Sequence, residues 1–212
     1  MSSADFIDSL GYQRASAIVR WHDQEVAAAA MDAAIRGGFR IVEFTMTTPG
    51  ALELVREYSN QSALVVGAGT VLTVEQAENA VRAGARFLVS PVVDEAVILA
   101  AESLGVAVIP GAHTPTEMLR AHDMGAPLLK LFPAPAGGPT WLRALLGPLP
   151  FLRVVPTNGV SADNAGEWLA AGAYAVGFAA ALFEPSYLAV RNFDSVEEMA
   201  VRILARVRAA QR

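Results

Sequence analysis

Lys130 is the only lysine in the chain, which has fifteen arginines, and it lies in the apolar run Ala126-Pro127-Leu128-Leu129-Lys130-Leu131-Phe132-Pro133. Removal from water lowers the pKa of an ammonium group and makes the neutral amine available as a nucleophile toward carbonyls. We therefore consider Lys130 a candidate Schiff-base lysine. The alternative is a lysine at a strand end, with its stem on apolar surface and its charge in water.

Glu43 is a second charge in an apolar setting, because it interrupts the β-rich run Arg40-Ile41-Val42-Glu43-Phe44-Thr45-Met46. A buried carboxylate without a partner costs free energy, so a partner is expected. Pairing with Lys130 is one role. A carboxylate beside an amine is also the proton shuttle that imine chemistry requires. The two roles are compatible.

The elements that position these residues follow a regular order, in which an amphipathic stretch ends at a glycine and a short β-rich run follows. The repeated pattern predicts helices alternating with strands, because glycine past a helix end adopts the left-handed conformation at little cost. The glycines are Gly38, Gly84, Gly105, Gly125 and Gly172. The expected strands lie near residues 16–21, 40–46, 63–67, 87–91, 106–110, 128–132, 153–157 and 174–178.

Eight alternating units with nearly continuous apolar strands indicate a parallel sheet covered by helices. We predict an α/β fold, a (β/α)8 TIM barrel, as a single domain over residues 1–212, since no change of composition marks a boundary. A doubly wound open sheet is the alternative. The segment Gly67-Ala68-Gly69-Thr70 lacks the third glycine of a dinucleotide-binding fingerprint.

Composition limits the function classes. The chain is 53% hydrophobic and 17% charged with a net charge of −5, which argues against a nucleic-acid binder and favours small-molecule chemistry. The absence of cysteine excludes disulfides, thiolate metal ligands and a cysteine nucleophile. Three scattered histidines do not form a metal-site pattern. No signal-peptide or membrane-span pattern is found, so we expect a soluble cytoplasmic protein.

In a TIM barrel, the active site forms at the carboxyl ends of the strands. This rule brings together residues that are far apart in sequence. Ser90 and Pro91 shape the fourth loop, where Pro91 is a candidate for substrate contact. The residues selected by the rule are Arg20, Glu43, Thr70, Ser90, Pro91, His113, Lys130 and Thr157.

Five segments, in order, make the chain resemble the family of 2-keto-3-deoxy-6-phosphogluconate (KDPG) and 4-hydroxy-2-oxoglutarate (KHG) aldolases. The resemblance covers most of the chain and implies a barrel, commonly a homotrimer, that needs no metal or cofactor. The segments are Ile41-Val42-Glu43-Phe44-Thr45, Val66-Gly67-Ala68-Gly69-Thr70-Val71-Leu72, Val108-Ile109-Pro110-Gly111, Leu129-Lys130-Leu131-Phe132-Pro133-Ala134 and Pro156-Thr157-Asn158-Gly159-Val160.

The resemblance also implies roles for individual residues. Lys130 matches the Schiff-base lysine and Glu43 the general acid/base of a class I aldolase that cleaves a keto acid to pyruvate and an aldehyde. Thr70 and Thr157 match positions that line the substrate site, where we also expect Phe132.

The chain differs from the family pattern at two places that concern the substrate. Many members carry an arginine for the substrate carboxylate where this chain has Thr47, and Arg20 matches an arginine of phosphogalactonate aldolases that would replace it. The family usually offers a phosphate the backbone amides of a Gly-Gly pair and of a glycine-rich segment with a serine. In this chain Asn158 stands in the pair, and the segment Gly177-Phe178-Ala179-Ala180-Ala181-Leu182 lacks the serine and carries a phenylalanine. We expect the distal group near Asn158, Gly159, Gly177, Phe178 and Ala179, and give weight to nonphosphorylated substrates such as 4-hydroxy-2-oxoglutarate.

Two other function classes are considered. A phosphate-sugar isomerase or epimerase on the same barrel would use Glu43 as a base without a covalent intermediate. A noncatalytic keto-acid-binding barrel would keep the pair of Lys130 and Glu43 for structure alone.

Overall fold

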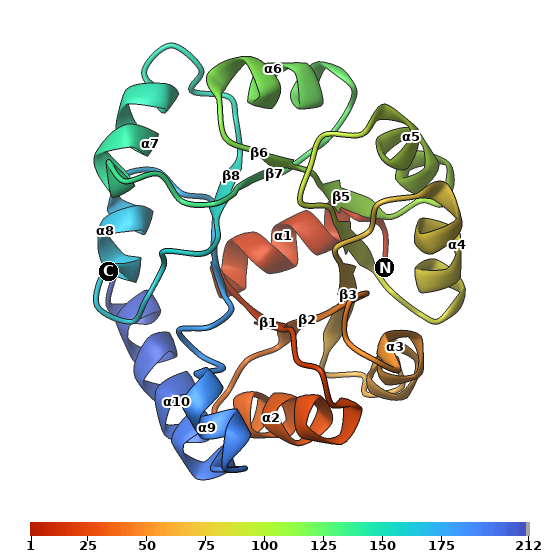
Figure 1. Ribbon diagram of the computed structural model, residues 1–212. Coiled ribbons are helices and arrows are strands. Elements are labelled where there is room, and N and C mark those ends of the chain that lie inside the picture. The colour runs from red at the N-terminus through yellow and green to blue at the C-terminus, as the bar shows by residue number, and fades with distance from the viewer. Residues whose placement is uncertain (211–212) are drawn as a thin grey trace.

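A computed structural model describes residues 1–210 and confirms the barrel: parallel strands form a ring that helices surround (Figure 1). Every predicted strand region contains a strand. Pro110 divides the fifth barrel strand into β5 and β6. The strands are β1 (Ala15–Val19), β2 (Ile41–Thr45), β3 (Val65–Gly69), β4 (Phe87–Val89), β5 (Ala107–Ile109), β6 (Gly111–Ala112), β7 (Leu129–Leu131), β8 (Val154–Pro156) and β9 (Val176–Phe178).

The strands form two parallel sheets that together make up the ring. The strand order is β5-β4-β3-β2-β1-β9 in one sheet and β6-β7-β8 in the other, and all neighbouring strands are parallel. A bridge between Thr157 and Gly177 joins the end of β8 to β9. With β5 and β6 as one barrel strand, β2 and β7 lie on opposite sides of the ring.

Capping residues mark the starts of four outer helices. The side chains of Asp23, Thr73, Asp94 and Thr114 each accept a hydrogen bond from a first-turn N–H, which stabilises a helix start. The helices after the strands are α2 (Gln24–Arg36), α3 (Ala51–Ser59), α4 (Val74–Arg82), α5 (Glu95–Ser103), α6 (Pro115–Asp123), α7 (Gly138–Leu146), α8 (Ala165–Ala170), α9 (Pro185–Ala189) and α10 (Phe193–Ala209).

Alternation along the strands decides which side chains face the barrel axis. In β2, Val42 and Phe44 join the apolar layer beneath the helices, so Glu43 between them points inward. In β7, Leu129 and Leu131 join the same layer, so Lys130 points inward. The two anomalous charges of the sequence therefore face the same interior.

The helix α1 (Ser3–Gln13) was not predicted, and it crosses the amino-terminal end of the ring (Figure 1). A capping box formed by Ser2 and Asp5 begins this helix. Its Phe6 and Leu10 pack inside the barrel with Ile41 and other inward residues. Because the helix seals this end, it forms the floor of the interior.

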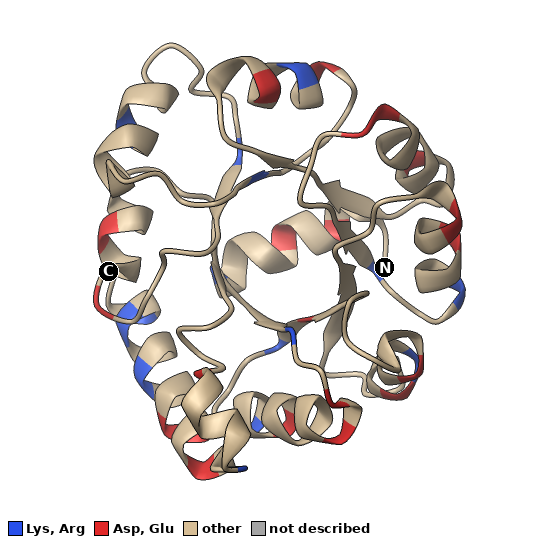
Figure 2. Cartoon of the chain, in the orientation of Figure 1, with Lys and Arg blue, Asp and Glu red and all other residues tan. Residues whose placement is uncertain are grey.

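Charged residues lie mainly on the outer helices and their loops (Figure 2). The interior beneath the helices is a continuous apolar layer. Among residues 1–210, no helix combines the length and the apolar character needed to cross a membrane.

Candidate active site

Lys130 and Glu43 line the same internal space directly above α1. Lys130 projects from β7 and is 6% exposed, and Glu43 projects from the opposite strand β2 and is 2% exposed. The space between them is also lined by Leu10 of α1 and by Thr157. The structure thus brings the two predicted catalytic residues together across the barrel.

Burial shifts both groups toward their neutral forms. Burial raises the pKa of the Glu43 carboxyl, an effect that the charges of Lys130 and Arg20 partly oppose. Burial lowers the pKa of the Lys130 ammonium; the charge of Glu43 acts against this shift and that of Arg20 acts with it. A neutral amine suits nucleophilic attack, and a carboxyl with a raised pKa suits proton transfer in both directions.

The carboxyl of Glu43 is left available for a further group. Glu43 Oε1 is buried without a hydrogen-bond partner, and no ion pair joins Glu43 to Lys130 within the described chain. Unpaired buried acceptors are costly and mark sites where a ligand or water completes the bonding.

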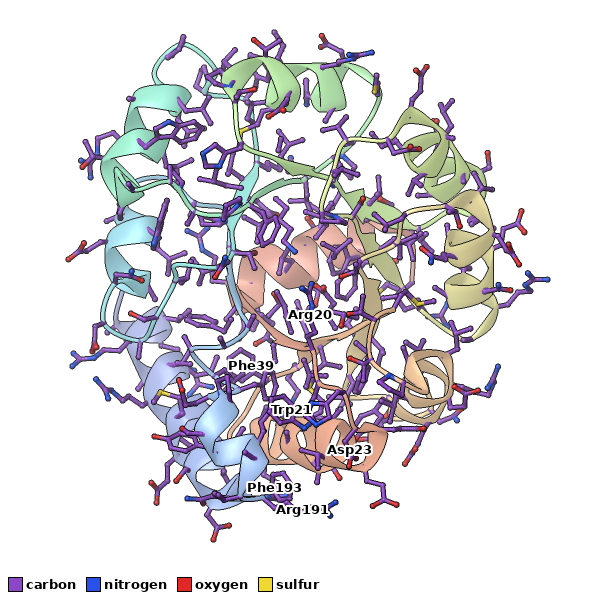
Figure 3. The ribbon with its side chains drawn as sticks, viewed as in Figure 1. Arg20, Trp21, Asp23, Phe39, Arg191 and Phe193 are labelled. Carbon is purple, nitrogen blue, oxygen red and sulfur yellow. The ribbon has the colours of Figure 1, made fainter. Side chains whose placement is uncertain are left out.

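Arg20 lies at the mouth of the barrel, just beyond the end of β1, and is labelled in Figure 3. Its Nη2 donates a hydrogen bond to Thr70 Oγ1 at 3.0 Å, and Thr70 follows β3 in the left-handed region with φ 58°. The remaining guanidinium donors are suited to a carboxylate. This bond orients Arg20 toward the same cavity as Lys130.

Thr47 takes no part in that cavity. Its hydroxyl oxygen lies 3.1 Å from that of Thr45, which in turn lies 3.2 Å from that of Thr48. Thr48 also accepts a hydrogen bond from the N–H of Trp21. The threonines therefore link the loop after β2 to the loop that carries Arg20.

A cavity of about 250 Å³ opens at this mouth and is lined by half of the predicted site residues. Lys130 Nζ lies 4.8 Å from the ring centre of Phe132, a cation–π contact. Thr157 Oγ1 is buried without a hydrogen-bond partner. The predicted residues in the lining are Arg20, Lys130, Phe132, Thr157, Asn158 and Ala179.

Other predicted residues lie beside the cavity or away from it. Gly177 lies beneath Thr157, since a Cβ there would be 2.6 Å from Thr157 Oγ1. The side chain of Phe178 faces outward and packs edge-on against Phe39, with ring centres 6.1 Å apart. Gly159, with φ 108°, lies in the loop beside Asn158 but not in the lining.

Pro91 and His113 line a neighbouring cavity of about 430 Å³, which Phe132 separates from the first. The Pro91 carbonyl lies against Gly111, where a side chain would not fit. His113 Nδ1 is 2.8 Å from the carbonyl oxygen of Pro133. These residues therefore shape the wall behind Phe132. In the described part of the chain, no three carboxylate or imidazole groups lie close enough to bind a metal ion.

Sequence reasoning missed several lining residues, namely Ile18, Trp21, Ala180, Phe183 and Pro185. Trp21 directly follows Arg20, so its position beyond a strand end was a usable signal. Phe183 reaches the cavity because the carbonyl of Ala179 accepts the N–H groups of Leu182 and Phe183, which folds the loop back. No sequence pattern indicated that turn.

Comparison with known proteins bears on the family and the fold of the chain. The family model described as KDPG and KHG aldolase matches residues 7–199. The chain is 38% identical to 2-dehydro-3-deoxy-phosphogluconate aldolase of Treponema pallidum, over 77% of this chain and 79% of that protein. It is 34% identical to 2-dehydro-3-deoxy-6-phosphogalactonate aldolase of Escherichia coli K12, over 91% and 92% of the two chains.

One similar solved structure bears on chemistry. It is KDPG aldolase from Legionella pneumophila, with pyruvate captured as a covalent carbinolamine intermediate. The TM-score is 0.84 at 27% identity, covering 93% of this chain and 97% of that one. The relative from Escherichia coli K12 and this structure therefore each match more than nine-tenths of the chain.

Proposed function

The chain belongs to the KDPG and KHG aldolase family, whose relatives are aldehyde-lyases, and we propose that Lys130 is its Schiff-base nucleophile and Glu43 its general acid/base. The substrate is a 2-keto-3-deoxy sugar acid, with or without phosphate, or 4-hydroxy-2-oxoglutarate. The products are pyruvate and an aldehyde. One observation carries the proposal: a buried lysine of lowered pKa faces a buried carboxyl with an unpartnered oxygen across one interior.

In the first half of the reaction, the neutral Lys130 amine attacks the keto carbon, C2, and forms a C–N bond. The carbonyl oxygen takes a proton and gives a carbinolamine. Protonated Glu43 then donates a proton to that hydroxyl, which leaves as water, and a protonated imine remains. Burial supports this step because it favours the neutral amine and the protonated carboxyl.

In the second half, the Glu43 carboxylate takes the proton of the 4-hydroxyl, directly or through a water. The C3–C4 bond breaks, its electron pair moves toward the imine nitrogen, and the aldehyde departs from an enamine. Protonation at C3 and attack of water at C2 then release pyruvate and restore Lys130. General acid/base catalysis of this kind contributes roughly 10²–10⁴-fold.

The substrate carboxylate is proposed to bind Arg20, which Thr70 orients. The unpartnered hydroxyl of Thr157 is proposed to bind a substrate hydroxyl or the carbinolamine oxygen. Phe132 covers Lys130 and limits water beside the imine. No cofactor enters these steps.

Reductive trapping tests the proposal. The protein is incubated with pyruvate and borohydride, its intact mass is recorded, and the adduct is mapped by peptide mass spectrometry. A reduced pyruvyl adduct on Lys130 is expected, and Lys130→Met should give none. Absence of an adduct in the folded wild-type protein would contradict the mechanism and support a noncovalent isomerase or a binding protein.

We further propose that the protein acts in the cytoplasm as a homotrimer. Apolar side chains exposed after the neighbouring strands β3 and β4 support a contact between subunits; they are Leu72, Val74 and Val92. Light scattering should give three times the chain mass of 22.3 kDa. Leu72→Arg should lower that mass, and an unchanged trimer would place the contact elsewhere.

A further inference from the structure

We infer that the Thr48 hydroxyl is a positioning group for substrate binding: it fixes the main chain that carries Arg20 and thereby sets the affinity of the site for the carboxylate of the keto acid. The inference rests on the proposed function, in which Arg20 binds that carboxylate. Thr48 lines neither the cavity of about 250 Å³ at the mouth nor the interior between Lys130 and Glu43, so it acts through another residue.

The side chain of Arg20 is held at a single point. Its Nη2 donates a hydrogen bond to Thr70 Oγ1 at 3.0 Å, and within residues 1–210 no carboxylate forms an ion pair with it. Arg20 is exposed, and a long exposed side chain has many rotamers open to it. The position of the Arg20 Cα therefore decides where the free donors of the guanidinium can reach.

That Cα belongs to a peptide unit that Thr48 holds. The peptide group between Arg20 and Trp21 is planar, so the Arg20 Cα and the Trp21 N–H move as one rigid unit. The Trp21 N–H donates to Thr48 Oγ1 at 3.3 Å. Because β1 ends at Val19, this N–H lies beyond the strand ladder, and a side-chain hydroxyl takes the place of a strand carbonyl.

Thr48 is itself fixed to the end of β2. It is 2% exposed, and its N–H donates to the carbonyl of Thr45 at 2.8 Å. Its carbonyl accepts the N–H of Ala51 at 3.2 Å, which joins it to the start of α3. The hydroxyl oxygens of Thr48 and Thr45 are 3.2 Å apart. The hydroxyl of Thr48 therefore links the strand that carries Glu43 to the loop that carries Arg20.

A second contact joins the same two loops. A Cβ built on Gly50 would overlap the side-chain amide of Gln24, so that amide lies directly against the backbone of the loop after β2. Gln24 begins α2, and Gly50 precedes α3 with φ 68°. The loops after β1 and β2 therefore pack as one unit, and Figure 3 shows Arg20 on the side of this unit that is nearer the middle of the barrel.

Loss of the Thr48 hydroxyl should weaken binding and spare the chemistry. Without its acceptor, the Trp21 N–H is unpaired and the peptide unit of Arg20 loses its fixed orientation. Thr48→Val should therefore raise the pyruvate concentration for half-maximal borohydride trapping by about three- to tenfold, the value of one hydrogen bond. The trapping rate at saturating pyruvate should stay within about twofold of wild type, because only binding has changed.

Two further variants serve as controls. Thr48→Ser keeps the hydroxyl and should recover most of the affinity. Thr47→Val makes the same chemical change one residue earlier, at an exposed side chain whose hydroxyl lies 3.1 Å from that of Thr45, and it should leave half-maximal pyruvate unchanged. Circular dichroism and thermal unfolding of each variant show whether the barrel is intact.

A double-mutant cycle with Arg20→Gln separates positioning from general damage to the fold. If Thr48 acts through Arg20, the added Thr48→Val has no guanidinium left to misplace, and the double variant should bind pyruvate as Arg20→Gln does. Losses that add in the double variant would overturn the inference, since Thr48 would then act by a route that does not include Arg20.

The outcomes also distinguish this inference from the proposed function. A wild-type adduct on Lys130 together with unchanged half-maximal pyruvate in Thr48→Val would overturn the positioning role and leave the aldolase mechanism intact. Failure of the folded wild type to form any adduct on Lys130 would overturn the proposed function, and the positioning role with it.

Discussion

Gly69 provides the space in which the Glu43 carboxyl lies. A Cβ built on Gly69 would overlap Glu43 Oε1, its carboxyl carbon and its Cγ. The two residues are on neighbouring strands, where Glu43 pairs with Gly67 and Gly69 pairs with Thr45. Gly69 therefore leaves room on the inward face of β3, and the carboxyl of Glu43 occupies it.

Substitution Gly69→Ala should displace the Glu43 carboxyl and lower kcat by about 10²-fold or more, since acid/base geometry is lost. Gly166→Ala is the matched control, because the nearest atom to a Cβ there is 3.6 Å away. Steady-state kinetics and circular dichroism check the result. A folded Gly69→Ala enzyme with full kcat would mean that the present carboxyl position is not the active one.

Glu43→Gln should move the pH dependence of adduct formation to lower pH. The negative charge of Glu43 raises the pKa of Lys130, so its removal lowers that pKa further and frees the amine at lower pH. Overall cleavage should nevertheless fall by roughly 10²–10⁴-fold. Rates of borohydride trapping against pH measure the shift, with the exposed helix residue in Glu102→Gln as control. A shift to higher pH would contradict the assigned coupling.

Arg20→Gln should raise the pyruvate concentration needed for half-maximal trapping by about ten- to a hundredfold, the value of a hydrogen-bonded charge. Arg20→Lys should recover part of the loss, because it restores the charge but not the planar pair of donors. Thr70→Val should have a smaller effect in the same direction, since it removes only the bond that orients Arg20. Unchanged trapping in Arg20→Gln would assign the carboxylate to another group.

Thr157→Val separates function from stability. The buried Thr157 hydroxyl has no partner in the protein, so an isosteric apolar side chain should leave the melting temperature unchanged or raise it. Activity should fall about tenfold, because the substrate loses a hydrogen bond of about 1–2 kcal/mol. Thermal unfolding and kcat/KM are measured on the same sample. Loss of stability together with retained activity would give the hydroxyl a structural role.

Phe6→Ala should destabilise the barrel through its floor. The Phe6 ring stacks on Phe87 with centres 4.4 Å apart and is fully buried. Large-to-small changes at such sites cost about 3–5 kcal/mol. Chemical denaturation measures the loss, and Phe151→Ala, at a ring that is 51% exposed, should cost far less. Equal effects of the two changes would show that α1 contributes little to stability.

The strands and the burial of Glu43 and Lys130 in one interior could be predicted because both depend on local pattern. Glycines past helix ends, apolar runs and the anomalous charges Glu43 and Lys130 are visible without coordinates. Helix α1 was not predicted. The spacing of its apolar residues does not distinguish a helix that packs inside a barrel from one that packs on its outer surface. Phe178 and Phe183 show the same limit: only the turn at Ala179 decides which phenylalanine faces the cavity.

Helix α1 closes one end of the barrel, and this affects the order in which the two products leave. With the amino-terminal end sealed by Phe6 and Leu10, ligands pass through the mouth beside Arg20. In the proposed mechanism, pyruvate is attached to Lys130 at the inner end of this passage, and the aldehyde occupies the outer end. In that mechanism the aldehyde leaves first and pyruvate last, because pyruvate stays bonded to Lys130 at the closed end of the passage until water hydrolyses the imine.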